Sequence, residues 1–232
     1  MRAAGHDLLA GVDEVGRGCW AGPVYAAAVV LPARCFDDRA LLAEVTDSKL
    51  LTPAKRERLA DDVLRLALGA AIGWVEAPAI DRLNILGATR LAMRAALACL
   101  DGPPAAISAG GSWGAQRLCG SVSPDFVLTD AVPLPDVTLP QRAVIRGDRC
   151  CLSIAAASIV AKVARDAEMQ RRAARYPSFE FAQNKGYGTR RHLGALRVAG
   201  VTPLHRRTFA PVKYLLGLHD HVAGALPRPD GE

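Results

Sequence analysis

Acidic side chains stand at the ends of three apolar stretches in this 232-residue chain, and their chemistry depends on whether those ends meet. Asp13 and Glu14 follow LLAGV, Asp130 follows FVLT, and Asp148 comes after an apolar stretch at 142–146. Ligands of open α/β sheets bind where strands end, so converging ends would crowd four carboxylates into one small region. Such carboxylates repel one another and raise each other's pKa values, and a divalent cation relieves that repulsion.

The type of these side chains predicts which cation they would take. All four are carboxylates, and no Cys/His spacing resembles a zinc site, which favours Mg²⁺ or Mn²⁺. Two such ions can stabilise both the attacking and the leaving oxygen when a phosphodiester bond is cleaved. A single acid after a strand is more often a solvated turn residue, so spacing alone favours that interpretation for Asp130 and Asp148.

The segment Gly16, Arg17 and Gly18 follows the first acid pair after one residue and gives the backbone unusual freedom. Glycine lets the main chain approach a ligand closely, so that N–H and C=O groups can meet a polar group on it. Arg17 can place its guanidinium fork on a phosphate. A hairpin turn also needs glycines, and both roles can hold at once.

Composition limits the class of protein. The net charge of +6 and the pI near 9.2 fit a polyanionic partner, but only modestly. The six cysteines include no CxxC pair, and Cys150 and Cys151 are adjacent, which favours incidental thiols in a reducing compartment. The N-terminal MRAAGHD lacks the apolar core of a signal peptide, and no apolar run approaches the ~20 residues of a membrane span. We therefore expect a soluble, cytoplasmic protein with no membrane partner.

Apolar periodicity and turn residues predict an α/β domain with a mixed sheet. Strands are expected at 6–13, 22–31, 69–76, 126–130 and 142–146, the first two forming a hairpin. Helices are expected at 53–68, 78–100 and 153–175, with a short helix between Thr189 and Gly200. Residues 101–124 are rich in Gly, Pro and Ser, which predicts a surface loop or an insertion.

Long blocks of the sequence resemble ribonuclease HII, the prokaryotic type 2 ribonuclease H. The resemblance covers most of residues 8–217, in blocks that read GVDEVGRG, AGPVYAAAVVL, DSK, IDRLNIL, GD, SIAAASIVAKVARDAEM, NKGYGT and HRRTFAPVK. It implies a ribonuclease H-like fold, with a five-stranded mixed sheet flanked by helices and a C-terminal helical extension. We expect the core at 1–175 with a loop insertion at 101–124, the extension at 176–221 and a disordered tail at 222–232.

The resemblance also implies an activity and a set of metal ligands. It implies an endonuclease that hydrolyses RNA in RNA–DNA hybrids and cuts 5′ of single ribonucleotides embedded in duplex DNA, leaving a 3′-hydroxyl and a 5′-phosphate. By motif position, Asp13, Glu14, Asp130 and Asp148 resemble the ligands of two divalent ions, Mg²⁺ or Mn²⁺. The strand ends single out the same four acids.

Further residues resemble the family's substrate contacts. The GRG segment resembles the part that binds the ribonucleotide at the RNA–DNA junction, where main-chain groups of Gly16, Arg17 and Gly18 can meet the 2′-hydroxyl. Tyr187 in KGY resembles the family tyrosine that packs against the sugar after the ribonucleotide. A flat ring on that sugar tolerates no added hydroxyl. Without the resemblance, Tyr187 would be interpreted as a half-buried structural residue.

Other polar residues in the matching blocks suit phosphate contact. Ser48 and Lys49 of the DSK block offer a hydroxyl and an ammonium, although read alone they form a solvated loop. Lys162 and Arg165 lie on the long predicted helix and could face phosphate, but solvent exposure is the preferred interpretation. His205 is expected to be structural or a phosphate contact, not a base.

The chain departs from the family pattern after the third acid, where Ala131 and Val132 replace the usual Gly-Asn. A second class of function therefore stays open, a catalytically weakened or inactive protein that binds RNA–DNA hybrids on the same fold. Binding alone would not need four carboxylates, because they repel phosphates unless a metal intervenes. A broad ribonuclease H that cuts only long hybrids shares the chemistry, but GRG and Tyr187 argue against it. We expect a monomer, and the sequence does not indicate a clamp or repair partner.

Overall fold

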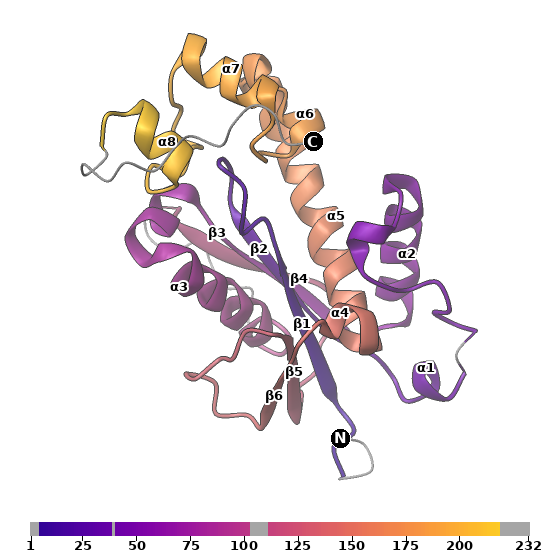
Figure 1. Cartoon of the computed structure of the whole chain (residues 1–232). Coiled ribbons are helices and arrows are strands. Elements are labelled where there is room, and N and C mark those ends of the chain that lie inside the picture. Colours follow the sequence, from indigo (N-terminus) through magenta and orange to yellow (C-terminus); the bar gives the residue numbers. More distant parts are fainter. Residues whose placement is uncertain (1–4, 39, 103–110, 219–232) are drawn as a thin grey trace.

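The computed structural model describes residues 5–38, 40–102 and 111–218 of the chain. They form a six-stranded mixed sheet with helices on both faces (Figure 1), so the predicted α/β architecture is confirmed. In spatial order the strands are β4 (Trp113–Gly120), β3 (Gly69–Val75), β2 (Val24–Val30), β1 (Leu9–Val15), β5 (Phe126–Asp130) and β6 (Gln141–Val144). The disordered tail expected at 222–232 lies outside the described residues.

Strand pairing brings two of the predicted acids together at the ends of two neighbouring strands. β1 pairs antiparallel with β2, which confirms the predicted hairpin, and it pairs parallel with β5. Val12 lies opposite Thr129, so Asp13 and Asp130 come next on their strands. Because parallel neighbours run in the same direction, both acids lie where β1 and β5 end.

β4 is an edge strand that the sequence analysis missed, and it makes the sheet six-stranded rather than five-stranded. It lies within 101–124, for which the composition predicts a loop; residues 103–110 of that segment are outside the described part. β4 pairs antiparallel with β3, and its Ala115 faces the core beside α3 (Ala77–Ala98). Only part of this strand is buried and its flanks carry Gly and Ser, so its apolar pattern is weak.

Helices cover both faces of the sheet (Figure 1). α3 packs on one face, while α5 (Leu152–Arg175) and α2 (Pro53–Leu66) pack on the other. Side chains alternate along β1, so Val12 faces α3 and Gly11 faces α5. By the same alternation, Asp13 lies on the α5 side and Glu14 on the α3 side.

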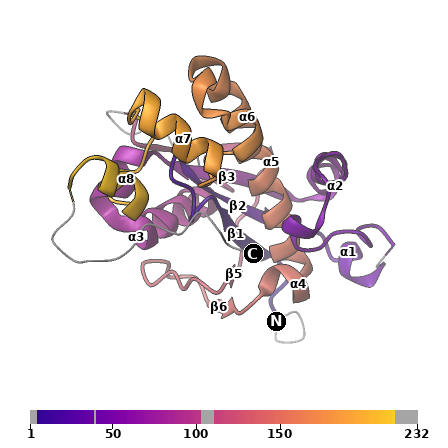
Figure 2. The same ribbon diagram turned by 45° about the horizontal axis from the view of Figure 1, so that its top comes forward.

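The remaining elements are short, and none of the described helices is long and apolar enough to cross a membrane. They are α1 (Arg34–Asp37), the 3-10 turn η2 (Ser48–Leu50), α4 (Gly147–Cys150), the 3-10 turn η3 (Pro177–Phe179), α6 (Phe181–Asn184), α7 (Arg190–Ala199) and α8 (Ala210–Leu215). Helices α6 to α8 gather at the end of the sheet where β1 runs into β2 (Figures 1 and 2). There, Met169, Phe181 and Val212 form an apolar cluster around Ala21 of the β1–β2 turn.

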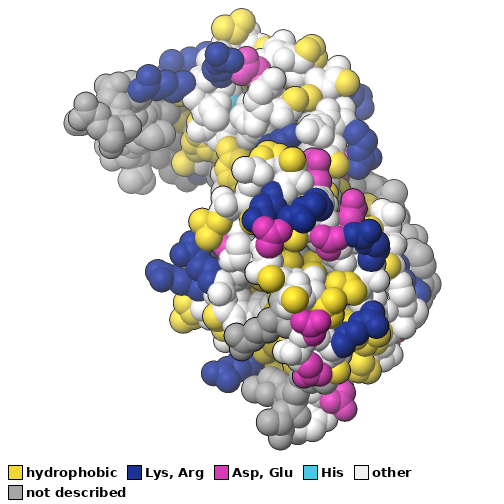
Figure 3. Space-filling view, turned by 90° about the vertical axis from the view of Figure 1, so that its right-hand side faces the viewer, with side chains coloured by type: hydrophobic (Ala, Val, Ile, Leu, Met, Phe, Trp, Pro, Cys, Tyr) yellow, Lys and Arg dark blue, Asp and Glu magenta, His cyan; other side chains and the backbone are white. Residues whose placement is uncertain are grey.

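Basic and acidic side chains are interspersed on the face formed by α2 and α5 (Figure 3). Lys55 and Arg58 both pair with Glu44, and Lys162 pairs with Asp166 at 2.7 Å. The positive net charge is therefore not gathered into one patch on this face.

Gly11 lets α5 lie directly against β1, and we expect a larger residue to disturb that contact. A Cβ at Gly11 would overlap the backbone of Ser153, which cannot yield without a shift of α5. Gly11→Ala should lower the free energy of unfolding by about 1–3 kcal/mol, measured by chemical denaturation. Gly194→Ala on α7 is the control, because a Cβ there meets nothing within 4 Å and alanine favours a helix. Equal effects of the two substitutions would contradict this packing role.

Candidate active site

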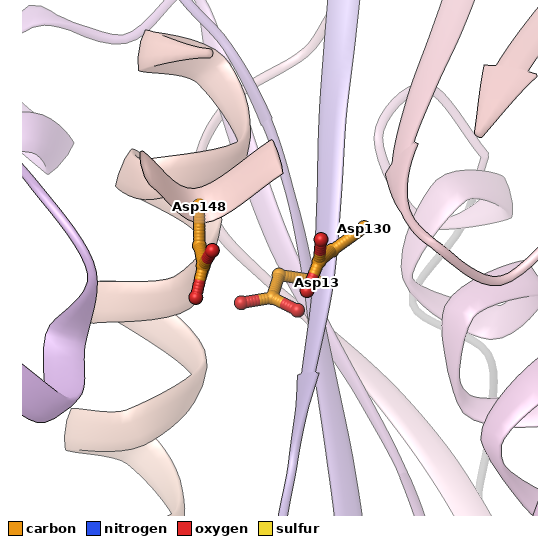
Figure 4. A group of neighbouring side chains, drawn as sticks. All are labelled: Asp13, Asp130 and Asp148. Atoms are coloured by element: carbon orange, nitrogen blue, oxygen red, sulfur yellow. The ribbon is translucent and has the colours of Figure 1, made fainter. Parts of the chain in front are cut away.

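Three aspartates from separate elements meet where β1 and β5 end. Asp13 lies on β1, Asp130 ends β5 and Asp148 lies on α4. Each offers a carboxylate oxygen, and these oxygens all lie within 4.8 Å of one another. Figure 4 shows the three carboxyl groups converging, with that of Asp13 between the other two. The structure thus brings together three of the four predicted acids.

Backbone amides hold these carboxylates in place. Oδ1 of Asp13 accepts a hydrogen bond from the N–H of Glu14 at 2.7 Å. Oδ1 of Asp130 accepts one from the N–H of Gly147 at 2.8 Å, which joins the end of β5 to the first residue of α4. Asp148 is the next residue, so this hydrogen bond also places the third acid.

Burial and mutual repulsion raise pKa values at this site. Asp13 is only 5% exposed, and its pKa is raised well above its usual value by burial first, and then by the charges of Glu14, Asp130 and Asp148. Burial also raises the pKa of Asp148, with further repulsion from Asp47 and Asp130. The site therefore favours the uptake of positive charge, as protons or as a cation.

Glu14 lies on the opposite side of β1 from Asp13 and stands outside the group of three. Its Oε1 accepts a hydrogen bond from Nη1 of Arg17 at 3.1 Å, whereas its Oε2 is buried with no hydrogen-bond partner among the described residues. Burial raises the pKa of Glu14 although Arg17 opposes this, and Asp130 adds repulsion. A buried acceptor without a partner is costly, so this oxygen is available to a ligand.

The donor set fits a hard divalent cation. The converging atoms are all carboxylate oxygens, and within the described ranges no His or Cys joins them. A cation among the three aspartates would relieve the repulsion around Asp13, and the unpartnered oxygen of Glu14 is a further acceptor on the other side of β1. Mg²⁺ and Mn²⁺ prefer such oxygen ligands, so Asp13, Glu14, Asp130 and Asp148 are the residues that could hold the metal.

The turn that follows β1 is tied to the segment that carries Tyr187. The chain bends at Gly16, whose φ of +89° lies in the left-handed region that favours glycine. The N–H groups of Trp20 and Ala21 donate to the carbonyl of Gly186 at 2.8 and 3.2 Å. The GRG segment and Tyr187, far apart in sequence, are therefore neighbours in the fold.

Tyr187 presents a partly exposed ring beside this turn. Its exposed fraction is 39%, and Lys162 Nζ and the Arg165 guanidinium lie 5.9 and 5.8 Å from the ring centre. Burial raises the pKa of Tyr187 to about 12, so its hydroxyl stays protonated at neutral pH. The ring can offer an apolar surface to a sugar.

The DSK block is more tightly held than a solvated loop. Asp47 is buried, accepts a hydrogen bond from the N–H of Lys49 at 3.0 Å and pairs with Arg149 at 3.1 Å. Ser48 is also buried, and its Oγ accepts a hydrogen bond from the Ser158 hydroxyl at 2.8 Å. Lys49 is the exposed member of the block.

The prediction that Arg165 is exposed to solvent is wrong, and the sequence analysis makes no prediction for Arg206. The preferred interpretation of Arg165 is solvent exposure, but the side chain is completely buried, and it donates to the carbonyls of Pro23 and Lys185 at 3.0 and 2.9 Å. Arg206 is buried as well and binds carbonyls of the GRG segment. Arginine is seldom buried, and the VARD and HRRTF blocks were the only sequence signal for these two positions.

His205 is structural, one of the two roles expected for it. It is buried, and its Nε2 lies 3.0 Å from Nε2 of His192. The N–H of Thr202 donates to its Nδ1 at 3.0 Å. Burial lowers the pKa of His205 to about 4, so the ring is neutral at physiological pH.

Ala131 adopts a backbone conformation that suits the glycine usual in the family pattern. Its φ is +54°, and the N–H of Val132 donates to the carbonyl of Asp130 at 2.6 Å. Ala131 therefore holds a left-handed conformation after the third acid, at a cost of about 1–2 kcal/mol for a residue with a Cβ.

Comparisons with known proteins agree with this geometry. The family model for Ribonuclease HII matches residues 10–212. Ribonuclease HII of Chloroflexus aggregans is 48% identical over 220 residues, covering 95% of this chain and 94% of that protein. The crystal structure of ribonuclease H2 from Pyrococcus horikoshii OT3 matches with a TM-score of 0.65 and 24% identity, over 89% of this chain and 96% of that one. Bst-RNase HIII in complex with Mn²⁺ matches with a TM-score of 0.61 and 20% identity, over 92% and 70%. At these identities the two structures show the fold alone.

The raised pKa values predict how stability depends on pH and metal. In metal-free protein the native state holds more protons than the unfolded chain from about pH 4 up to the raised pKa values, so stability falls as pH rises through this window. At a pH above the raised pKa values, Asp13→Asn removes one repelling charge and should raise the metal-free Tm by a few degrees, about 2–4 °C per kcal/mol. At low pH this difference should vanish.

The same thermal scans with Mn²⁺ test the ligand assignment. At about a hundred times its Kd, Mn²⁺ should raise the Tm of the unaltered chain by about 5–10 °C. Asp13→Asn should lose most of this gain. An Asp13→Asn variant with a lower metal-free Tm than the unaltered chain would contradict the repulsion. A gain in Tm with Mn²⁺ equal to that of the unaltered chain would contradict the role of Asp13 as a ligand.

The left-handed conformation of Ala131 predicts a stabilising substitution. Ala131→Gly relieves strain at φ +54° but adds freedom to the unfolded chain, for a net gain of up to about 1 kcal/mol in denaturant unfolding. Ala54→Gly in the first turn of α2 is the control and should cost up to about 1 kcal/mol, because glycine disfavours a helix. A loss of stability at both positions would show that Ala131 is not strained.

Proposed function

The chain belongs to the ribonuclease HII family, and on that premise we propose that it cuts duplex DNA on the 5′ side of single embedded ribonucleotides as well as hydrolysing the RNA strand of RNA–DNA hybrids. Membership in the family makes it an endonuclease of the ribonuclease H type, which is a hydrolase. The observation that carries the finer proposal is the short connection between the acidic cluster and the GRG segment. Asp13 lies on β1, and Gly16 begins the turn directly after that strand.

Asp13, Glu14, Asp130 and Asp148 are the proposed ligands of two divalent ions, Mg²⁺ or Mn²⁺. Support comes from the three converging carboxylates, the unpartnered oxygen of Glu14 and the raised pKa of Asp13. The fold relative Bst-RNase HIII is a complex with Mn²⁺. When bound, such ions lower the pKa of a water and neutralise charge on the oxygens of the phosphate.

The proposed reaction is an in-line displacement at phosphorus. A water attacks the phosphorus on the 5′ side of the ribonucleotide, and the bond to the 3′ oxygen of the preceding nucleotide breaks. That oxygen takes up a proton, which leaves a 3′-hydroxyl on one strand end and a 5′-phosphate on the other. The buried carboxylates hold their positions through backbone amides, so little reorganisation is needed when charge develops.

The GRG segment and Tyr187 are the proposed readers of the junction. Gly18 is exposed, a Cβ there would meet nothing within 4 Å, and its φ is outside the left-handed region. Neither packing nor backbone strain requires glycine at this position, and the open space beside it would admit a ribose close to the backbone. Tyr187 would lie on the next sugar, where a 2′-hydroxyl is excluded by its ring.

Single residues, rather than a broad positive face, contact the phosphates. Lys49 and Arg17 are exposed and carry the proposed contacts. Ser48 acts by holding the turn beside Lys49, since its hydroxyl is buried against Ser158. The mixed charges on the α2–α5 face agree with this arrangement (Figure 3).

A labelled DNA duplex with one ribonucleotide tests the proposal. With Mg²⁺ or Mn²⁺, one cut on the 5′ side of the ribonucleotide is expected, and none in an all-DNA duplex. Asp13→Asn should lower the rate by at least about a hundredfold, since it removes a proposed metal ligand. Binding without cutting in both metals would instead support a hybrid-binding protein with a weakened site.

Gly18→Ala separates the junction contact from folding. The added methyl should leave the Tm nearly unchanged, because it meets open space. It should lower kcat/KM on the single-ribonucleotide duplex about tenfold or more, because it displaces the ribose from the backbone. Inhibition by an all-DNA duplex should stay as it is. Full activity of this variant would remove Gly18 from the junction site.

A further inference from the structure

Arg206 is a fully buried guanidinium whose hydrogen bonds go to the backbone of the β1–β2 turn. Its Nη2 donates to the carbonyl of Gly16 at 2.7 Å, its Nη1 to that of Arg17 at 2.8 Å and its Nε to that of Gly22 at 3.0 Å. It forms no ion pair with the described residues. Its guanidinium also lies 5.0 Å from the centre of the Phe209 ring. A buried cation that has carbonyls and a ring but no counter-ion is costly, which calls for a reason beyond stability.

The geometry of the peptide bond fixes the direction in which the neighbouring N–H groups point. In a trans peptide the C=O and the following N–H point in opposite directions, and no cis peptide occurs in the described residues. With the carbonyls of Gly16 and Arg17 directed at Arg206, the N–H groups of Arg17 and Gly18 are directed away from it. Both residues are exposed, and neither N–H has an acceptor within the described part of the chain.

The guanidinium also strengthens these two amides as donors. A charged donor on a carbonyl polarises its peptide, which makes the attached N–H a better hydrogen-bond donor. Burial lowers the pKa of Arg206 to about 10, so the group still carries its charge at neutral pH. Two adjacent, polarised and outward-facing N–H groups favour an oxygen acceptor.

A second buried guanidinium, that of Arg165, packs against the same turn. Arg165 of α5 donates to the carbonyls of Pro23 and Lys185, and a Cβ at Gly16 would overlap its side chain. Two buried arginines therefore contact the turn. Of these, Arg206 is the one that donates hydrogen bonds to carbonyls of the GRG segment.

We propose that Arg206 is a positioning residue for the junction, which aims the amides of Arg17 and Gly18 at the 2′-oxygen of the ribonucleotide. This inference rests on the proposed function and adds a residue that does not itself touch the substrate. Lysine could supply the charge but not the fork that holds two carbonyls at once. Arg206→Lys should therefore weaken the discrimination between ribose and deoxyribose, whereas the affinity for an all-DNA duplex should persist.

Steady-state cleavage of the single-ribonucleotide duplex tests this, with an all-DNA duplex as competitor. Arg206→Lys is expected to lower kcat/KM about tenfold to a hundredfold, while the inhibition constant of the all-DNA duplex changes less than about twofold. Arg172→Lys is the matched control, since Arg172 is a half-buried arginine of α5 that pairs with Glu76 and Glu168 instead of the turn. It should lose stability without this selective effect.

The outcomes distinguish a failure of the proposed function from a failure of the role of Arg206. If the unaltered chain does not cut the ribonucleotide duplex, the proposed function fails and this inference fails with it. If the unaltered chain cuts and Arg206→Lys cuts equally well, or loses affinity for both duplexes alike, only the role of Arg206 is overturned.

An NMR measurement on the unaltered chain covers the case in which Arg206→Lys does not fold. The amide signals of Arg17 and Gly18 should shift on addition of the ribonucleotide duplex, without divalent ions so that no cutting occurs. The all-DNA duplex should shift them much less. Signals that do not respond to the ribonucleotide would overturn the proposal.

Discussion

Repulsion between buried carboxylates is the constraint on which the rest of this structure depends. Carboxylate oxygens of Asp13, Asp130 and Asp148 lie within 4.8 Å of one another, in a site where burial already opposes the charges of Asp13 and Asp148. Such an arrangement does not form by itself, so the fold has to impose it. The parallel pairing of β1 and β5 places two acids, and the Gly147 amide on Asp130 places the third. A cation bound there would restore the stability that the repulsion removes.

β1 links the acidic cluster to the surface that would read the substrate. The strand carries Asp13 near its end and runs on into the turn at Gly16, so a shift of one displaces the other. Residues from the distant C-terminal half hold this turn, among them Arg206 and the Gly186 carbonyl. The loops that carry Gly186 and Arg206 thus hold the GRG segment in place beside the end of β1.

Much of this arrangement could be predicted from the sequence, because it follows local patterns. Apolar runs that end in acids indicated the strands of Asp13 and Asp130, and the blocks resembling ribonuclease HII indicated the family. The period of two along a strand implies that Asp13 and Glu14 face apart, which the sequence analysis did not apply. β4 could not be predicted, because the apolar pattern of this partly buried edge strand is weak. The burial of Arg165 and Arg206 could not be predicted either, because it depends on carbonyls that are distant in sequence. The roles of the four acids as metal ligands stay a prediction.

Calorimetric titration with Mn²⁺ in several buffers would test the coupling of charge and metal most directly, because it counts the protons released on binding. We expect the unaltered chain to release protons on binding at pH values below its raised carboxyl pKa values, and fewer protons as the pH rises through them, since these carboxyl groups must ionise before they bind. Asp13→Asn should bind Mn²⁺ much more weakly and release fewer protons. Equal affinity and equal proton release in both proteins would contradict a site built on carboxylate repulsion.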